Sequence, residues 1–157
     1  MADPEDIRGW QRLSSSVTTS GKLDPHDPAR LAAIGVRHVI NLALDDHPEA
    51  LADEEALLAA EGIGYTHIPI PFDRPEAHHY DSFRQALDQA DGPVHVHCIM
   101  NYRVSAFFYL LHIAQGMETG EARALMGRQW DPLGGTDQRS APWAALINQL
   151  AGSPTVP

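Results

Sequence analysis

HVHCIMNYRVS, spanning His95 to Ser105, is the stretch that decides how this sequence folds. A valine-rich apolar run leads into Cys98, the only cysteine of the chain, and the helical stretch AFFYLLHIAQG follows Ser105. A strand, a tight loop and a helix start in this order bring backbone N–H groups and the positive end of a helix dipole to the loop. The stretch therefore predicts a site that holds an anion against a nucleophilic thiol. The same field is expected to lower the pKa of Cys98.

Segments typical of strands alternate with segments typical of helices along the rest of the chain. This alternation predicts an α/β fold in a single domain over residues 1–157, with a central, mainly parallel sheet and helices on both faces. Ligands bind outside the carboxyl ends of the strands in such sheets, and Cys98 follows one of these ends. Residues 1–12 and the tail 152–157 are expected to be loose. The expected strands are 13–19, 36–44, 65–70 and a run from 94. The first expected helix is capped by Asp24 or Asp27 and ended by Gly35, and the other expected helices are 51–61, 80–87, 103–115, 119–128 and 142–150.

The composition restricts the partners that the protein can have. The chain carries a formal net charge of −10, which argues against general binding to nucleic acid or to an anionic membrane surface. Its apolar runs are too short to cross a bilayer, and the N-terminus lacks the hydrophobic stretch of a secretory signal. A single cysteine excludes an internal disulfide, and a lone thiol suits a reducing compartment. We therefore expect a cytoplasmic protein that attracts its anionic substrate locally, through one loop and a few arginines.

Four motifs of this chain occur in the order and spacing of a known family: TSG at 19–21, GVRHVINLAL at 35–44, GIGYTHIPIPFD at 62–73 and GPVHVHC at 92–98. Over roughly residues 13–115, the chain resembles the bacterial branch of the dual-specificity-like, cysteine-dependent protein tyrosine phosphatases. The resemblance implies a dual-specificity-phosphatase-like fold. It also implies hydrolysis of phosphoesters through a phosphocysteine intermediate, with no metal or other cofactor. The implied partner is a phosphorylated protein or a small phosphoester substrate.

The signature loop is one residue shorter than the common pattern of this family. Four residues separate Cys98 from Arg103, whereas the family usually has five. Aligned without a gap, Asn101 matches the family's loop glycine, Val104 its arginine and Ser105 its hydroxyl residue. Asparagine is the non-glycine residue that best tolerates a positive φ. Because the shortened loop also resembles that of a bacterial subgroup, we expect a rearrangement in which Arg103 still reaches the anion.

The resemblance implies a role for each polar residue around the loop. Cys98 would attack phosphorus, while Arg103 and the backbone N–H groups would bind the phosphate oxygens. Ser105 would hydrogen-bond the thiolate, and His97 would orient the loop by bonding to backbone groups. Asp73, which follows the strand at 65–70 on the same sheet edge, would protonate the leaving oxygen as general acid. The residues expected to bind phosphate are Ile99, Met100, Asn101, Tyr102, Arg103 and Val104.

Two other functions fit parts of the pattern. A rhodanese-like sulfurtransferase carries a persulfide in a loop with four residues between cysteine and arginine, which is the spacing from Cys98 to Arg103. A catalytically weak, phosphate-binding pseudophosphatase module would explain the displaced arginine. The phosphatase interpretation is favoured because the rest of the chain resembles a phosphatase and because Asp73 offers an acid. The depth of the cleft, and therefore the substrate, is expected to depend on the loops at 44–50, 72–79 and 130–140.

Each candidate also has a purely structural interpretation. Arg103 would then form an ion pair with Asp45 or Asp46, instead of meeting a substrate. Asp73 would only terminate a turn or cap a helix. The hydroxyl of Ser105 would bond to the backbone of its own helix.

A zinc site is disfavoured although the chain has nine histidines. His95 and His97 share one face of a strand, while Cys98 points to the other face. His97 is therefore interpreted as a structural histidine. The carboxylates of Asp45, Asp46, Glu54 and Glu55 are expected to lie on solvated faces or to cap helices. Trp130 and Trp143 are expected to be packing residues.

Overall fold

A five-stranded sheet lies at the centre of the computed structural model, which describes residues 2–135 and 138–151. The predicted loose tail at 152–157 lies outside the described residues. The strands are β1 (Gln11–Arg12), β2 (Val17–Ser20), β3 (His38–Asn41), β4 (Gly64–His67) and β5 (Val94–His97). The helices are α1 (Asp27–Ala33), α2 (Glu54–Ala60), α3 (Ala77–Gln89), α4 (Tyr102–Ala114), α5 (Thr119–Met126) and α6 (Ala141–Ala151).

The strand order is β1-β2-β5-β3-β4, so that β5 lies between two parallel neighbours. The pair β3–β4 is also parallel, and only β1 runs antiparallel to its neighbour β2. The predicted mainly parallel sheet is therefore confirmed. In the register of the sheet, His97 at the end of β5 is opposite both Ser20 of β2 and Asn41 of β3. Three carboxyl ends thus lie side by side directly before Cys98.

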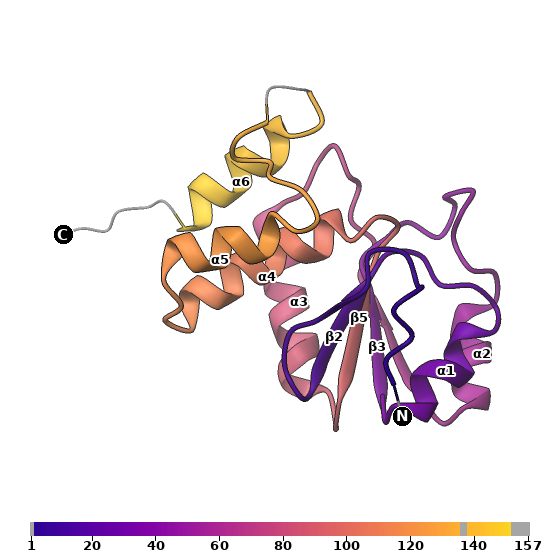
Figure 1. Cartoon of the computed structure of the whole chain (residues 1–157). Coiled ribbons are helices and arrows are strands. Elements are labelled where there is room, and N and C mark those ends of the chain that lie inside the picture. Colours follow the sequence, from indigo (N-terminus) through magenta and orange to yellow (C-terminus); the bar gives the residue numbers. More distant parts are fainter. Residues whose placement is uncertain (1, 136–137, 152–157) are drawn as a thin grey trace.

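Helices cover both faces of the sheet, as the alternating pattern predicts (Figure 1). Helices α1 and α2 lie over one face, where Val39 packs with Leu31 and Leu58. The other helices lie over the opposite face, where Ile40 and Val96 belong to the larger core cluster. The adjacent residues Val39 and Ile40 of β3 therefore serve two separate cores, which explains why both are apolar.

Helix α4 is the central helix of the larger layer. Every residue from Arg103 to Leu110 is buried, which confirms the expectation from its apolar sequence. Its aromatic side chains meet those of α3 and α6, since Phe107 lies 5.4 Å from Phe83 and 5.6 Å from Trp143 between ring centroids. Within the described ranges, no helix is both long enough and apolar enough to cross a membrane.

The predicted strand at 13–19 is shorter in the structure, where β2 begins only at Val17, and a second strand, β1, lies in the segment 1–12 that was expected to be partly loose. Gln11 and Arg12 pair antiparallel with Thr19 and Thr18, and the chain turns between them. The backbone N–H of Leu13 donates to the Val17 carbonyl across this turn. The run of serines at 14–16 favours a turn because serine hydroxyls bond to nearby backbone groups.

Candidate active site

Cys98 lines a cavity of about 240 Å³ at the carboxyl edge of the sheet. Its own exposed fraction is only 1%. All three loops that were expected to set the depth of the cleft contribute to the walls, through His47, Phe72 and Arg139. A larger groove of about 490 Å³ lies at the amino ends of β2 and β5, away from the thiol. Among the described residues, the smaller cavity is lined by His47, Phe72, Cys98, Ile99, Met100, Tyr102, Arg103 and Arg139.

The loop after Cys98 presents a run of unpaired backbone donors. Within the described residues, none of the N–H groups from Ile99 to Val104 donates to a protein acceptor. Asn101 adopts φ 70° and ψ 10°, which confirms the expected positive φ at the position of the family's glycine. Helix α4 starts at the next residue, so its positive end adds to these donors. Such a run of N–H groups at a helix start binds anions.

Arg103 lines the same cavity as Cys98, although the loop is short. Its Nη1 donates to the Ile70 carbonyl at 3.2 Å, and its Cζ lies 5.4 Å from the centroid of the Phe72 ring. Its Nε is buried and has no hydrogen-bond partner in the described part of the chain. The shortened loop thus keeps the arginine at the cavity and buries Val104, the residue that aligns with the family's arginine, in the core.

The ion pair of Arg103 with Asp45 or Asp46 is not seen among the described residues. The side chain of Arg103 is nevertheless almost completely buried, with an exposed fraction of 6% for the residue. A buried charge without an opposite charge is unfavourable in a protein interior. The surroundings of Arg103 therefore indicate a site that an anion completes.

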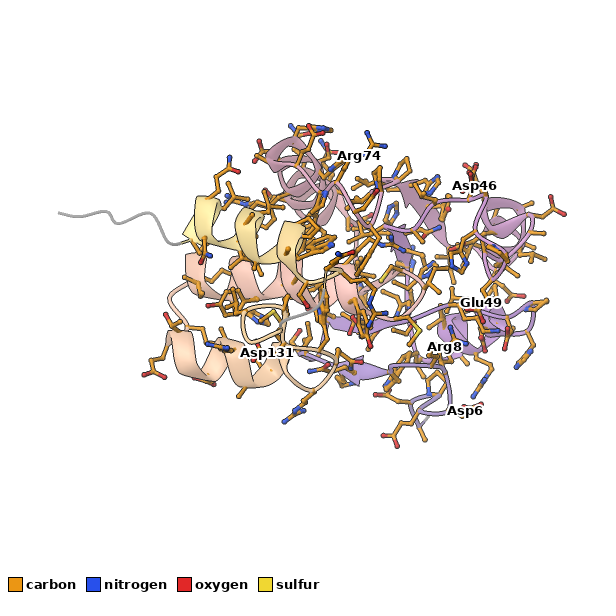
Figure 2. All side chains as sticks on the ribbon, turned by 90° about the horizontal axis from the view of Figure 1, so that it is seen from above. Asp6, Arg8, Asp46, Glu49, Arg74 and Asp131 are labelled. Atoms are coloured by element: carbon orange, nitrogen blue, oxygen red, sulfur yellow. The ribbon has the colours of Figure 1, made fainter. Side chains whose placement is uncertain are left out.

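The N-terminal segment 1–12 was expected to be partly loose. In the structure, it contacts the loop that follows Cys98. The carbonyl of Ile99 accepts from the Lys22 backbone N–H at 2.9 Å and from Arg8 at 3.4 Å. The side-chain amide of Asn101 donates to the Gly9 carbonyl at 2.7 Å. Arg8 also forms a salt bridge with Glu49, and Figure 2 shows the two residues side by side. Residues far apart in the sequence therefore fix the shape of the loop.

Gly21 is required for the close approach of the loop to the N-terminal half of the chain. A Cβ on Gly21 would lie 2.4 Å from the carbonyl oxygen of Ile99, which is far inside contact distance. We expect Gly21→Ala to displace the loop and to weaken phosphate binding by about tenfold or more, because anion sites are sensitive to shifts of about 1 Å. Isothermal titration with phosphate measures the effect.

Gly120→Ala in α5 is the matched control, since its new Cβ would meet only the flexible end of Glu118 at 3.3 Å. Alanine is also favoured over glycine within a helix. We expect this variant to bind phosphate as the wild type does. Equal affinity of Gly21→Ala and Gly120→Ala would show that the loop does not depend on the Gly21 contact.

His97 bonds to the backbone of the loop, as expected. Its Nδ1 lies 3.2 Å from the Cys98 carbonyl oxygen, and its Nε2 lies 2.5 Å from Glu54 Oε2. The prediction that Glu54 is solvated is wrong, because the exposed fraction of Glu54 is only 6%. The sequence offers no local signal for this, since a Glu-Glu pair at a helix start is also typical of a solvated first turn.

His95 is a satisfied structural residue rather than a metal ligand. Its Nδ1 and Nε2 each lie 2.8 Å from a hydroxyl, that of Thr18 and that of Ser20. Complete burial and the neighbouring His97 hold its pKa well below the usual range, so the ring is neutral. In the part of the chain that the structure describes, no group of three or more His, Cys, Asp or Glu side chains forms a candidate metal site.

Two residues with roles implied by the resemblance do not contact Cys98. The Asp73 carboxylate is 83% exposed and approaches Arg74 at 3.9 Å, although its neighbour Phe72 lines the cavity. The hydroxyl of Ser105 donates to the Tyr102 carbonyl at 3.3 Å, which is the structural alternative for this residue. The structure therefore brings Cys98, Arg103 and the N–H groups of the loop together, whereas Asp73 and Ser105 do not line the cavity.

The two tryptophans support the aromatic walls of the cavity. Trp130 stacks on Tyr102 with ring centroids 4.7 Å apart, and its Nε1 donates to the Tyr102 carbonyl at 2.9 Å. Trp143 is fully buried and donates to the Phe72 carbonyl at 2.7 Å. The expected packing role of both tryptophans is confirmed.

Comparison with known proteins agrees with this geometry. Residues 9–116 match the family described as the phosphatase-like domain of beta-lactamase hydrolase-like protein. No curated protein matches the chain in sequence. A candidate phosphatase (DUF442) from Shewanella putrefaciens CN-32 is 28% identical, with a TM-score of 0.80 over 94% of this chain and 92% of that chain.

Two more distant structures share the fold. TpbA of P. aeruginosa, solved in complex with pTyr, is 22% identical, with a TM-score of 0.69 over 98% of this chain and 95% of that chain. The core catalytic domain of the PP-IP phosphatase SIW14 from S. cerevisiae is 12% identical, with a TM-score of 0.70 over 90% and 87%. The dual-specificity-phosphatase-like fold predicted from the sequence is confirmed.

Proposed function

Because this chain belongs to the family of phosphatase-like domains of beta-lactamase hydrolase-like proteins, we propose that it hydrolyses phosphate monoesters with Cys98 as nucleophile. One observation carries the proposal. Cys98, Arg103 and three residues of the loop with unpaired N–H groups, Ile99, Met100 and Tyr102, line one cavity. A phosphoryl group placed there would meet a nucleophile on one side and hydrogen-bond donors on its three peripheral oxygens.

The first half of the reaction transfers the phosphoryl group to the protein. The thiolate of Cys98 attacks phosphorus, an S–P bond forms, and the bond from phosphorus to the ester oxygen breaks. Arg103 and the loop N–H groups hold the peripheral oxygens as their charge develops. The leaving oxygen takes up a proton, for which Asp73 is the proposed donor because it directly follows the cavity residue Phe72.

The second half regenerates the thiolate. A water molecule attacks the phosphocysteine, an O–P bond forms, and the S–P bond breaks. The carboxylate of Asp73 takes the proton of this water, which returns the acid to its starting state. The products are inorganic phosphate and free protein, so no metal ion or other cofactor enters the balance.

Hydrolysis of p-nitrophenyl phosphate in the presence of EDTA tests the proposed function. We expect turnover by the wild-type protein, inhibition by tungstate, and a phosphoryl adduct on the Cys98 peptide after an acid quench. Absence of turnover would refute the proposal. Phosphate binding without turnover would then favour a pseudophosphatase module, and release of sulfite from thiosulfate with cyanide would favour a sulfurtransferase.

The role of Asp73 depends on the leaving group of the substrate. We expect Asp73→Asn to lower kcat by about 100-fold with phenyl phosphate, whose leaving oxygen needs a proton. With p-nitrophenyl phosphate, whose leaving group is stable as an anion, the loss should be several times smaller. The ratio of kcat values for the two substrates measures this dependence.

Asp81→Asn, at an exposed position of α3, is the control for the loss of one surface carboxylate. If the ratio of kcat values for phenyl phosphate and p-nitrophenyl phosphate is the same in Asp73→Asn as in Asp81→Asn, Asp73 is not the general acid. His47→Gln would then be the next variant, since His47 also lines the cavity.

A further inference from the structure

Glu54 is a buried carboxylate for which the proposed reaction has no role. It begins α2, and its neighbour Glu55 in the same helix turn is exposed. The preceding Asp53 adopts φ 58° and ψ 32°, a left-handed conformation that non-glycine residues rarely adopt. This turn of the backbone starts the helix with Glu54 on its buried side. Backbone strain next to a buried charge is typical of functional sites.

The contacts of Glu54 lead directly to the nucleophile. Its Oε2 lies 2.5 Å from Nε2 of His97, and its Oε1 accepts from the side-chain amide of Asn41 at 3.3 Å. The other ring nitrogen of His97 lies 3.2 Å from the carbonyl oxygen of Cys98. A chain of hydrogen bonds thus joins α2 to the peptide that follows the thiol.

The chemistry of these atoms determines where a proton lies. The Cys98 carbonyl oxygen only accepts hydrogen bonds, so Nδ1 of His97 must carry the proton of that bond. Nε2 then either donates to a Glu54 carboxylate or accepts from a Glu54 carboxylic acid. In the first arrangement the ring carries a proton on both nitrogens and pairs with the carboxylate, and in the second it is neutral with its proton on Nδ1; in both, Glu54 holds Nε2 and thereby keeps Nδ1–H aimed at the Cys98 carbonyl.

The proton on Nδ1 determines the direction of a loop donor. In a planar trans peptide, the C=O and N–H groups point in opposite directions. The bond from His97 to the Cys98 carbonyl therefore aims the Ile99 N–H away from His97. This N–H is the first of the unpaired donors in the loop. Loss of the bond would free the Cys98–Ile99 peptide to rotate.

We propose that Glu54 is a positioning residue, which holds the His97 ring through Nε2 and thereby fixes the orientation of the Cys98–Ile99 peptide in the anion-binding loop. Glu54 touches neither the thiol nor the cavity, since it is absent from the described lining of the cavity. Its effect passes entirely through His97. Only the kinetic readout below rests on the proposed phosphatase function, because ring protonation and anion binding are measurable without turnover.

Three variants separate the proposed role from plain stability. Glu54→Leu removes every partner of His97 Nε2 on this side, whereas Glu54→Gln keeps an amide that can donate to Nε2. Glu55→Leu is the matched control in the same helix turn. We expect Glu54→Leu to release the His97 ring from the Cys98 carbonyl, so that the Nδ1–H signal protected from exchange in nitrogen-edited NMR is lost and tungstate binding weakens by about tenfold or more. Glu54→Gln should keep the signal, with an affinity within about threefold of the wild type.

In kinetics, Glu54→Leu should lower kcat more than it raises KM, because the loop N–H groups bind most strongly as charge develops. A wild-type protein whose His97 carries no proton on Nδ1 would overturn the proposal. So would a folded Glu54→Leu with unchanged tungstate affinity, as judged beside Glu55→Leu. If Glu54→Leu does not fold, Glu54→Gln decides. A loss of tungstate affinity of about tenfold or more in Glu54→Gln would overturn the proposal and assign the effect to the charge of Glu54 alone. If the wild type hydrolyses no phosphoester, the proposed function fails while NMR and tungstate titration still test Glu54.

Discussion

Cys98→Ser is expected to abolish hydrolysis of p-nitrophenyl phosphate, with a loss of kcat/KM of at least about 1,000-fold. A serine hydroxyl stays protonated at neutral pH, and it is both a poorer nucleophile and a poorer leaving group from phosphorus than a thiolate. The cavity contains no second cysteine, because Cys98 is the only one in the chain. Initial rates in EDTA between pH 5 and 8, for the wild type and the variant, measure the effect.

The same variant should still bind anions. Tungstate meets the loop N–H groups and Arg103, which the substitution leaves in place. We therefore expect the dissociation constant of tungstate to stay within about threefold of the wild type, since one uncharged hydroxyl replaces one thiol. Turnover that persists in Cys98→Ser would contradict the proposed mechanism and would assign the chemistry to another group. Loss of both turnover and binding would show that the substitution disrupts the loop itself.

Much of the fold could be predicted because its signals are local. The alternation of apolar strands and amphipathic helices predicts a parallel sheet, and the glycines that end the first two helices predict their boundaries. Gly35 and Gly62 indeed adopt φ values of 94° and 76°, which glycine favours after a helix. Strand β1 could not be predicted, since two residues have no periodicity and pair only because β2 lies beside them.

The candidate site also has a part that the local sequence predicts and a part that it does not. Cys98, Asn101 and Arg103 lie within one strand–loop–helix unit, so their proximity follows from the local sequence. The partners that hold the loop come from distant segments, and nothing in the sequence around Arg8 or Glu54 distinguishes them from surface residues. The burial of Glu54 and the contacts of both residues arise only from tertiary packing, which decides whether a carboxylate is solvated or paired.

Asp73 shows the limit of reasoning from a motif. Its position after an apolar strand at the correct sheet edge matches the family's acid, yet its side chain is exposed in the structure. The sequence position determines which loop carries the carboxylate. The side-chain direction depends on loop packing around Phe72 and on the bound substrate, and neither is encoded in the few residues of the motif.

Arg103→Lys is expected to lower kcat/KM by about 100- to 1,000-fold, because an ammonium group cannot replace the two parallel donors of a guanidinium. The geometry makes this position demanding. The guanidinium is held by the Ile70 carbonyl on one side and by the Phe72 ring on another, and its buried Nε has no hydrogen-bond partner among the described residues. Arg128→Lys, at an exposed position, is the control and should leave the kinetics unchanged.

Stability should change in the opposite direction from activity. In the absence of ligand, Arg103 is a buried charge without a carboxylate among the described residues, so Arg103→Met should raise the free energy of unfolding by about 1–3 kcal/mol. Phosphate at about 100 times its Kd should stabilise the wild type by about 2.7 kcal/mol and leave Arg103→Met unaffected. Thermal unfolding with and without phosphate measures both effects. A variant that is less stable than the wild type without ligand, and that phosphate still stabilises, would show that Arg103 serves the fold instead of the anion.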